Sequence, residues 1–148
     1  FRRSIYVQAR RTLKLGMLDA FDAPTMTPNC EQRNSSTVAG QSLLFMNNAE
    51  LLSQSEIFAA RVVADAGTDV AAQVRRAWRL ALATDATAEE IDQSLMFLAV
   101  QKDIAVQQVS ELSPEEKKAV RFADQPEKQA LATFCQFLLS NNAFLYVD

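Results

Sequence analysis

Hydrophobic and polar positions recur along most of the chain at the three- and four-residue spacing that is typical of amphipathic helices. The pattern starts after a polar stretch, residues 27–37, and predicts a helix from Thr37 that ends at the junction of two asparagines, residues 47–48. The next helix is predicted over Ala49–Ala66, where Gly67 supplies the stop. A third is predicted over residues 69–83, with Trp78 as an interior anchor.

Capping motifs predict where the following helices begin. In "TAEE" the Thr87 hydroxyl can accept a hydrogen bond from the Glu90 amide while the Glu90 carboxylate reaches back. This motif predicts the longest helix, which runs to about Val109, and "SPEE" predicts a short surface helix capped by Ser113. A last amphipathic helix is predicted over residues 125–140, before an extended tail, "FLYVD". The residues expected to face inward on the two long helices are Ile91, Leu95, Leu98, Ala105 or Val106, Val109, Leu131, Phe134, Phe137 and Leu138.

The composition favours one mainly α-helical domain of five or six helices over residues 1–148. Three Gly and four Pro leave little material for hairpin turns, while good helix formers are abundant. Two short stretches, residues 4–8 and 144–147, favour β-structure, and each would leave backbone groups unpaired if it stood alone. We therefore expect these chain ends to pair as antiparallel strands on the helical body.

The charge pattern excludes several classes of partner. A net charge of −3 gives no overall field to attract nucleic acid or an anionic membrane, and no stretch approaches the roughly 20 apolar residues that a membrane-spanning helix needs. We therefore expect a soluble domain that neither binds nucleic acid nor inserts into a membrane. Five Lys and Arg side chains lie within residues 1–15, and we interpret them as solvated charges that meet acidic surface rather than as a polyanion site.

The absence of histidine removes the usual general base and the imidazole ligands of zinc and haem. No complete catalytic set, metal site or cofactor site is therefore predicted within this chain. Cys30 and Cys135 belong to no CxxC pair, so they form either two buried thiols or one long-range disulfide. We favour buried thiols, because Cys135 lies between two phenylalanines on a packed helix, where a thiol behaves as a small apolar group.

One polar cluster stands directly before a helix start, where unpaired amides and the helix dipole favour an anion. It could bind a carboxylate, sulfate or phosphate, or form part of a catalytic site completed elsewhere. We favour a structural role, in which Ser36 or Thr37 caps the helix and Arg33 is at least half buried against a carboxylate or loop carbonyls. Asp19 and Asp22 are spaced as turn caps or arginine partners rather than as a glycosidase pair. The residues of this candidate polar loop are Asn29, Glu31, Arg33, Asn34, Ser36 and Thr37.

Three segments, "RRSIYVQARR", "MLDAFDAPTMTPNCEQRNSSTVAGQSLLFMNN" and "CQFLLSNNAFLYVD", resemble the C-terminal half of domain of unknown function 1553, the planctomycete-specific domain one. The family motif usually has two basic residues where Gln32 and Arg33 stand, so Gln32 is a departure from it. The residues that follow, Asn34, Gln41, Leu44 and Asn47, meet the family pattern.

The resemblance implies a C-terminal accessory or interaction domain of an exported, cytochrome-c-linked multidomain protein. Its partners would be the preceding domains of the same polypeptide, such as a cytochrome-c-like domain, and its location would be periplasmic or otherwise extracytoplasmic. No catalytic residues come with the resemblance, and the haem motif of the larger protein does not occur in this fragment. The alternative is a subdomain of an enzyme acting on polysaccharide or sulfated sugar, with its catalytic groups mostly outside this fragment.

Overall fold

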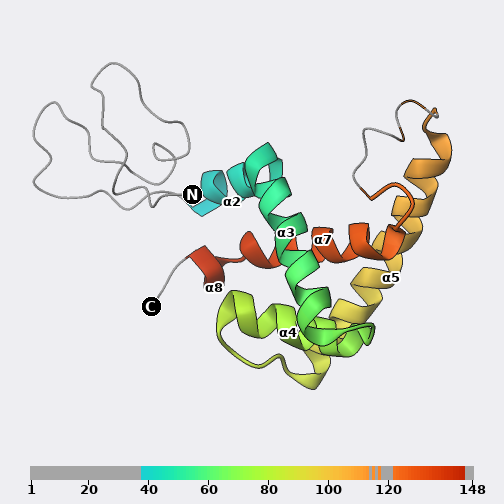
Figure 1. Ribbon diagram of the computed structural model, residues 1–148. Helices are drawn as coiled ribbons and strands as arrows, with labels where there is room; N and C mark the ends of the chain where they lie inside the picture. Colours follow the sequence, from blue (N-terminus) through green and yellow to red (C-terminus); the bar gives the residue numbers. More distant parts are fainter. Residues whose placement is uncertain (1–37, 114, 116, 118–121, 146–148) are drawn as a thin grey trace, which may run out of the picture. The chain divides into compact units, whose positions relative to one another are not determined.

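A computed structural model of the protein describes residues 38–113, 115, 117 and 122–145 (Figure 1). These residues form helices and no β-strand, so the predicted mainly α-helical fold is confirmed. The chain divides into two units, Phe1–Leu44 and Phe45–Asp148, and the core described below lies in the second. A single domain over residues 1–148 stays a prediction. The labelled helices are α2 (Val38–Asn47), α3 (Ala49–Ala66), α4 (Val70–Leu82), α5 (Ala88–Glu111), α7 (Pro126–Leu139) and α8 (Asn142–Leu145).

An asparagine separates α2 from α3, as the sequence predicts. Asn48 has an extended backbone, and its Oδ1 accepts hydrogen bonds from the amides of Glu50 at 2.9 Å and Leu51 at 3.2 Å. These bonds satisfy two of the donors that every helix N-terminus leaves unpaired. At the other end of α3, Gly67 has a φ of 70°, which a residue without Cβ adopts at little cost. Both predicted ends of α3 are therefore confirmed.

Helix α4 also has the predicted ends, Asp69 and Ala83. The Asp69 carboxylate accepts from the Ala71 amide at 3.1 Å, and the Ala83 amide donates to the Arg79 carbonyl at 3.1 Å. Among the described residues, Ala83 is the single non-glycine residue with a positive φ, 57°. An alanine thus occupies a left-handed position where glycine is the usual residue.

Two arginines of α4 tie the helix to its neighbours along the chain. Arg76 donates from Nε at 2.8 Å and from Nη2 at 2.6 Å to one carboxylate oxygen of Asp65 on α3. Arg79 reaches forward to Asp85 in the loop that precedes α5. Because these pairs are exposed, they orient the α3–α4 and α4–α5 turns more than they stabilise the fold.

The predicted capping box opens α5. The Thr87 amide donates to Glu90 Oε2 at 2.7 Å, and the Glu90 amide donates to Thr87 Oγ1 at 3.3 Å. The helix runs to Glu111, slightly past the predicted end at Val109. Of the two candidates for one inward position, Ala105 is buried and Val106 is 50% exposed.

The second predicted cap, Ser113, lies at the edge of the described residues. The Lys117 amide donates to the Ser113 carbonyl at 3.0 Å, which is the spacing of one helical turn. Glu115 and Lys117 are helical, in agreement with the short helix predicted from "SPEE". The other members of that motif, Pro114 and Glu116, lie outside the described residues.

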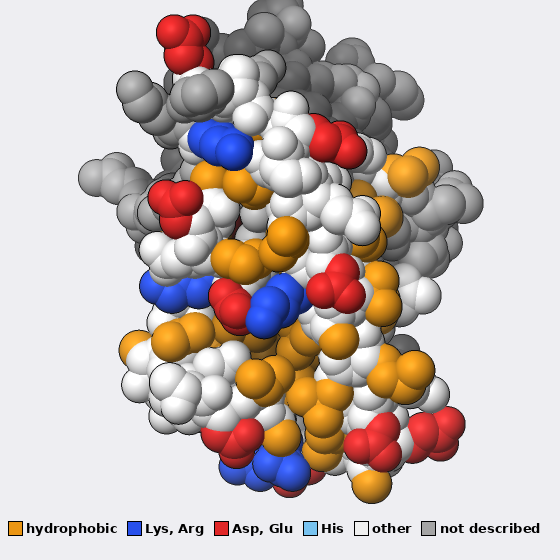
Figure 2. All heavy atoms as spheres, turned by 90° about the vertical axis from the view of Figure 1, so that its right-hand side faces the viewer, with side chains coloured by type: hydrophobic (Ala, Val, Ile, Leu, Met, Phe, Trp, Pro, Cys, Tyr) orange, Lys and Arg blue, Asp and Glu red, His pale blue; other side chains and the backbone are white. Residues whose placement is uncertain are grey.

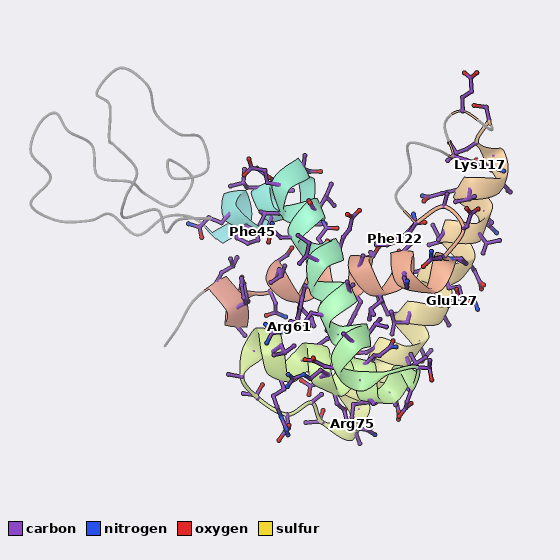
Figure 3. All side chains as sticks on the ribbon, viewed as in Figure 1. Phe45, Arg61, Arg75, Lys117, Phe122 and Glu127 are labelled. Carbon is purple, nitrogen blue, oxygen red and sulfur yellow. The ribbon has the colours of Figure 1, made fainter. Side chains whose placement is uncertain are left out.

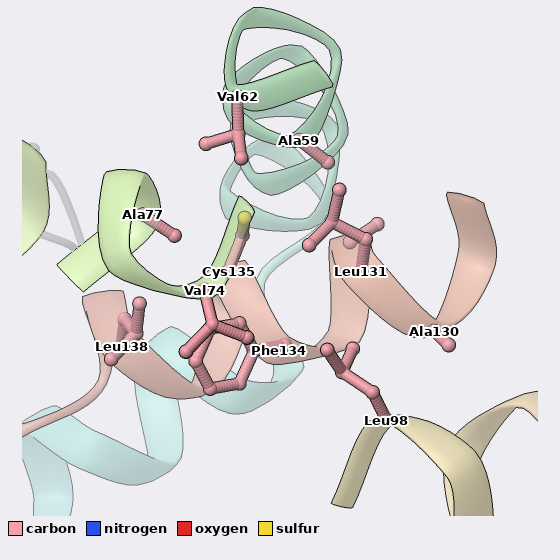
Figure 4. Close-up of a cluster of buried hydrophobic side chains, with 11 residues drawn as sticks. Ala59, Val62, Val74, Ala77, Leu98, Ala130, Leu131, Phe134, Cys135 and Leu138 are labelled. Atoms are coloured by element: carbon pink, nitrogen blue, oxygen red, sulfur yellow. The ribbon is translucent and has the colours of Figure 1, made fainter. Parts of the chain in front are cut away.

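Helix α7 lies at the centre of the helical core. It packs against α3, α4 and α5, and it supplies the largest fully buried side chains, Phe134 and Leu138 (Figure 4). Several partners on α3, α4 and α7 are alanines, whose small side chains allow close approach of the helices. The buried cluster comprises Ala59, Val62, Val74, Ala77, Leu98, Ala130, Leu131, Ala132, Phe134, Cys135 and Leu138.

Three expectations, two about the core and one about the end of the chain, need correction. Phe137, predicted to face inward, is 51% exposed, because it lies at the edge of the buried face of α7. Trp78 packs against the core but is only partly buried. Phe144 and Leu145, predicted to be extended, are helical in α8, so the proposed strand pair is wrong for these two residues. Its other half, residues 4–8, lies outside the described residues, as do residues 146–147.

Candidate functional site

The predicted polar loop lies outside the described residues. Its members, Asn29, Glu31, Arg33, Asn34, Ser36 and Thr37, precede the first described residue, Val38. The same holds for Cys30 and for the Asp19 and Asp22 pair. The structural, anion-binding and catalytic interpretations of the loop therefore all stay predictions.

Cys135 is a free thiol buried in the core. Burial raises its pKa to about 12, because a thiolate would lose its hydration there. A cysteine with so high a pKa is almost entirely protonated at neutral pH and is a poor nucleophile. The interpretation of Cys135 as a buried free thiol is confirmed, and this residue acts as a packing group.

A hollow of about 350 Å³ lies between α4, α5 and α7. Its walls are mainly aliphatic, and at its rim Lys102 Nζ lies 2.8 Å from Glu127 Oε1. Glu127 extends from the first turn of α7 (Figure 3). The hydrogen bond between the two groups raises the pKa of Lys102 and lowers that of Glu127, so both are charged at neutral pH. The lining residues are Val70, Gln73, Leu95, Leu98, Ala99, Lys102, Glu127, Ala130 and Leu131.

A smaller hollow of about 180 Å³ lies between α3 and α7 and has more polar walls. Most of its polar side chains bond to backbone carbonyls: Ser55 Oγ donates to Leu52 at 2.7 Å, Thr133 Oγ1 donates to Gln129 at 3.1 Å, and Gln136 Nε2 donates to Met46 at 2.7 Å. The first two bonds lie within α3 and within α7, and the third joins α7 to α2, so these polar groups already have structural partners. Gln129 Oε1 also lines the hollow and is buried without a hydrogen-bond partner among the described residues, but a single unpaired acceptor does not define a ligand site.

The feature that sequence reasoning missed is a second apolar side on α5. Leu98 and Ala105 fill the core, yet Met96, Val100 and Ile104 are exposed at four-residue steps on the opposite side of the helix, and Met96 is 72% exposed. The exposed residues Glu89, Gln93, Met96, Val100, Ile104, Gln107 and Glu111 follow one another at three- and four-residue steps, and we call them the α5 outer face.

Phe97, the residue next to Met96 in the sequence, lies beside the α5 outer face and packs against aromatic side chains of α7. Its ring centroid lies 6.0 Å from that of the half-exposed Phe137 and 6.2 Å from that of the buried Phe134. Figure 2 shows the side of the molecule on which α5 lies, where hydrophobic side chains reach the surface among acidic and basic ones. An apolar helix side of this kind is typical of contact with another protein element.

The described residues bring together no other reactive groups. Among them, no cluster of three or more Cys, Asp or Glu side chains is placed to hold a metal ion. None of the helices in the described ranges has the length and apolar character needed to cross a bilayer.

Together these features define an all-α domain with α7 at its centre and an exposed apolar side on its longest helix. The chain belongs to the family PSD1, protein of unknown function (DUF1553), whose sequence profile matches residues 1–98. The match includes α2, α3, α4 and the first part of α5, whereas the family-like ending "CQFLLSNNAFLYVD" falls outside it. No curated protein and no solved structure matches the chain.

Proposed function

We propose that this chain is a C-terminal accessory or interaction domain of an exported, cytochrome-c-linked multidomain protein. The observation that carries the proposal is the exposed apolar side of α5, at Met96, Val100 and Ile104. Covering these three partly exposed side chains would contribute roughly 3–5 kcal/mol, since full burial of one such side chain contributes about 1.5–3 kcal/mol. A helix that is apolar on two sides is suited to lie between two packed layers, and the core occupies only one of them.

The partners that we propose are the preceding domains of the same polypeptide, among them a cytochrome-c-like domain. The resemblance to multidomain proteins supports this partner, and so does the modest extent of the apolar surface, which suits contacts between tethered domains. We also propose an extracytoplasmic location. Fractionation of cells that express the full-length protein tests it, and recovery in the cytoplasmic fraction would contradict it.

The central experiment is an activity and redox assay of the full-length protein with and without this segment. An accessory domain predicts that removal of the segment leaves the rate constants of the remaining domains within about twofold while lowering their melting temperature. An enzyme subdomain acting on polysaccharide or sulfated sugar predicts instead that hydrolysis of such substrates falls by more than about a hundredfold. That second result would overturn the accessory role.

The polar loop provides an independent test of the same alternative. If Arg33 has a structural role, Arg33→Ala lowers the free energy of unfolding by about 1–3 kcal/mol, because its buried polar partners are left unsatisfied. Arg61→Ala is a suitable control, because Arg61 is exposed and makes only a 3.9 Å contact with Asp65. Unchanged stability of Arg33→Ala, together with loss of ligand binding or activity, would favour the enzyme alternative.

A further inference from the structure

Most of the charged side chains of α5 are acidic. The helix carries five acidic residues and one basic residue, Lys102, which is already paired with Glu127 at 2.8 Å. On the outer face, Glu89 stands at one end and Glu111 at the other, about 33 Å apart along the helix axis. The three apolar side chains lie between these two ends. The α5 outer face is therefore an apolar centre with an acidic group at each end.

A partner recognises such a face by complementary charge as well as by apolar contact. Opposite charges at matching positions fix the register of two surfaces and speed their encounter, whereas like charges disfavour the wrong partner. The matching surface would have an apolar centre and a Lys or Arg near each end. Between the apolar centre and the acids lie two exposed glutamines, Gln93, whose Nε2 donates to Glu89 Oε1 at 3.2 Å, and Gln107. Their side-chain amides contain both donors and an acceptor, so they can also hydrogen bond to a polar partner.

A second copy of this chain does not fit the same face. In a parallel contact Glu89 would meet Glu89 of the copy, and in an antiparallel contact Glu89 would meet Glu111. Both arrangements place carboxylates against carboxylates at each end. The apolar centre has only three side chains, whereas a stable complex between free proteins buries about 800 Å² and some 20–30 residues on each partner. A domain tethered by a short flexible linker needs less, since its effective concentration reaches the millimolar range.

We propose, on the basis of the proposed function, that the α5 outer face docks onto a preceding domain of the same polypeptide through a surface with an apolar centre and basic residues at both ends. Met96 is the most exposed apolar side chain of this face and lies near its middle. Docking covers the Met96 thioether and leaves Met46, which is 57% exposed on α2, as an internal reference.

The experiment measures the oxidation rates of individual methionines in the full-length protein under dilute hydrogen peroxide, by mass spectrometry of peptides. If the docked state is populated to about 90%, Met96 oxidises about tenfold more slowly than Met46. In the double variant Glu89→Lys/Glu111→Lys we expect this protection to fall below about twofold. The matched control is Glu50→Lys, because Glu50 is an exposed acid in the first turn of α3, as Glu89 is in α5. Thermal melting of each variant verifies that it folds.

Three results would overturn the proposal. Equal oxidation of Met96 and Met46 in the unaltered protein would show that nothing docks on this face. Protection that persists in Glu89→Lys/Glu111→Lys would show that the partner surface is not basic. Protection that grows with protein concentration would identify a second copy as the partner. Each of these results leaves the activity and redox assay unaffected, so the accessory role can stand or fall separately.

Discussion

Gly67 and Ala83 end successive helices with positive φ angles of 70° and 57°, and both backbones favour a residue without Cβ, although only the first position has one. The Gly67 backbone, with ψ of −142°, lies near a region that only glycine occupies readily. Ala83, with ψ of 15°, lies in the left-handed helical region, where a Cβ costs about 1–2 kcal/mol. The two positions therefore allow a paired test of backbone strain.

We expect Ala83→Gly to raise the free energy of unfolding by about 0.5–1 kcal/mol and Gly67→Ala to lower it by about 1–3 kcal/mol. No atom lies within 4 Å of a Cβ built on Gly67, so the loss would come from backbone conformation rather than from a clash. Urea denaturation of both variants measures the two changes. Shifts of the same sign would contradict this explanation.

Burial of Cys135 makes stability depend on pH in the alkaline range. The folded-state pKa of about 12 lies above the value near 9 for an exposed thiol, so above about pH 9 the unfolded chain releases a proton that the folded chain retains. The contribution of the buried Cys135 thiol to the free energy of unfolding is therefore fully present below about pH 9. It declines by up to about 1.4 kcal/mol per pH unit until about pH 12.

The measurement compares the free energy of unfolding at pH 8 and pH 10.5 for the unaltered protein and for Cys135→Ala. The comparison cancels the titration of Lys and Tyr residues, and the unaltered protein should lose more stability. In Cys30→Ser the one remaining thiol should not react with a thiol reagent at pH 8 until the protein is denatured. Rapid reaction in the folded state would contradict the burial of Cys135.

At the scale of single elements, the capping box at the start of α5 gives a direct test. Thr87→Ala removes the acceptor of the Glu90 amide, and we expect it to lower the free energy of unfolding by about 1 kcal/mol. Thr84→Ala is a matched control, because Thr84 is an exposed threonine of the same loop outside the capping box. Equal effects of the two changes would show that the box contributes nothing specific.

The contribution of the capping box to the free energy of unfolding should also depend on pH. The hydrogen bond to the Thr87 backbone, with a second to its side chain, lowers the pKa of Glu90. The contribution of the charged carboxylate is therefore present at neutral pH and is lost as the pH falls through the lowered pKa. The stability difference between the unaltered protein and Glu90→Gln should shrink in acid, as measured by chemical denaturation at a series of pH values.

Helix ends were predictable because they depend on local chemistry. Asn48, Gly67, Asp69 and Thr87 each act through groups a few residues away, so the sequence alone indicates their roles. The inward direction of a side chain depends instead on the position of the neighbouring helix. Phe137 follows the apolar spacing of α7 but lies about a quarter turn from the centre of the buried face, and it remains half exposed.

The candidate site was less predictable for the same reason. The spacing of Leu98 and Ala105 explains a buried side of α5, and nothing in that periodicity requires the other side to be polar. The signal was present at Met96, Val100 and Ile104, four residues apart, but only packing shows that no described helix covers them. The polar loop that the sequence emphasised lies outside the described residues.

At the scale of the whole molecule, the side chains that stabilise the fold pack around α7, whereas the proposed docking surface lies on the outer face of α5. Substitutions on the two should therefore have different effects on stability. Leu131 is buried where α7 packs against its neighbours, and we expect Leu131→Ala to lower the free energy of unfolding by about 2–5 kcal/mol. Met96→Ala on the outer face should change it by less than about 0.5 kcal/mol in this segment alone. Denaturant titration of both variants checks the contrast, and a large loss in Met96→Ala would show that the outer face is part of the core.

The order of the helices along the chain has a consequence for biosynthesis. Val62, Val74 and Leu98 are all translated before α7, the helix against which they pack. At about 5–20 residues per second, the ribosome needs roughly 2–8 s to pass from Leu98 to Leu138. During this interval α3, α4 and α5 can contact one another, but the apolar sides that face α7 are not yet covered. The nascent chain is therefore expected to be a chaperone client until α7 emerges, and α7 then completes the core in a single late step.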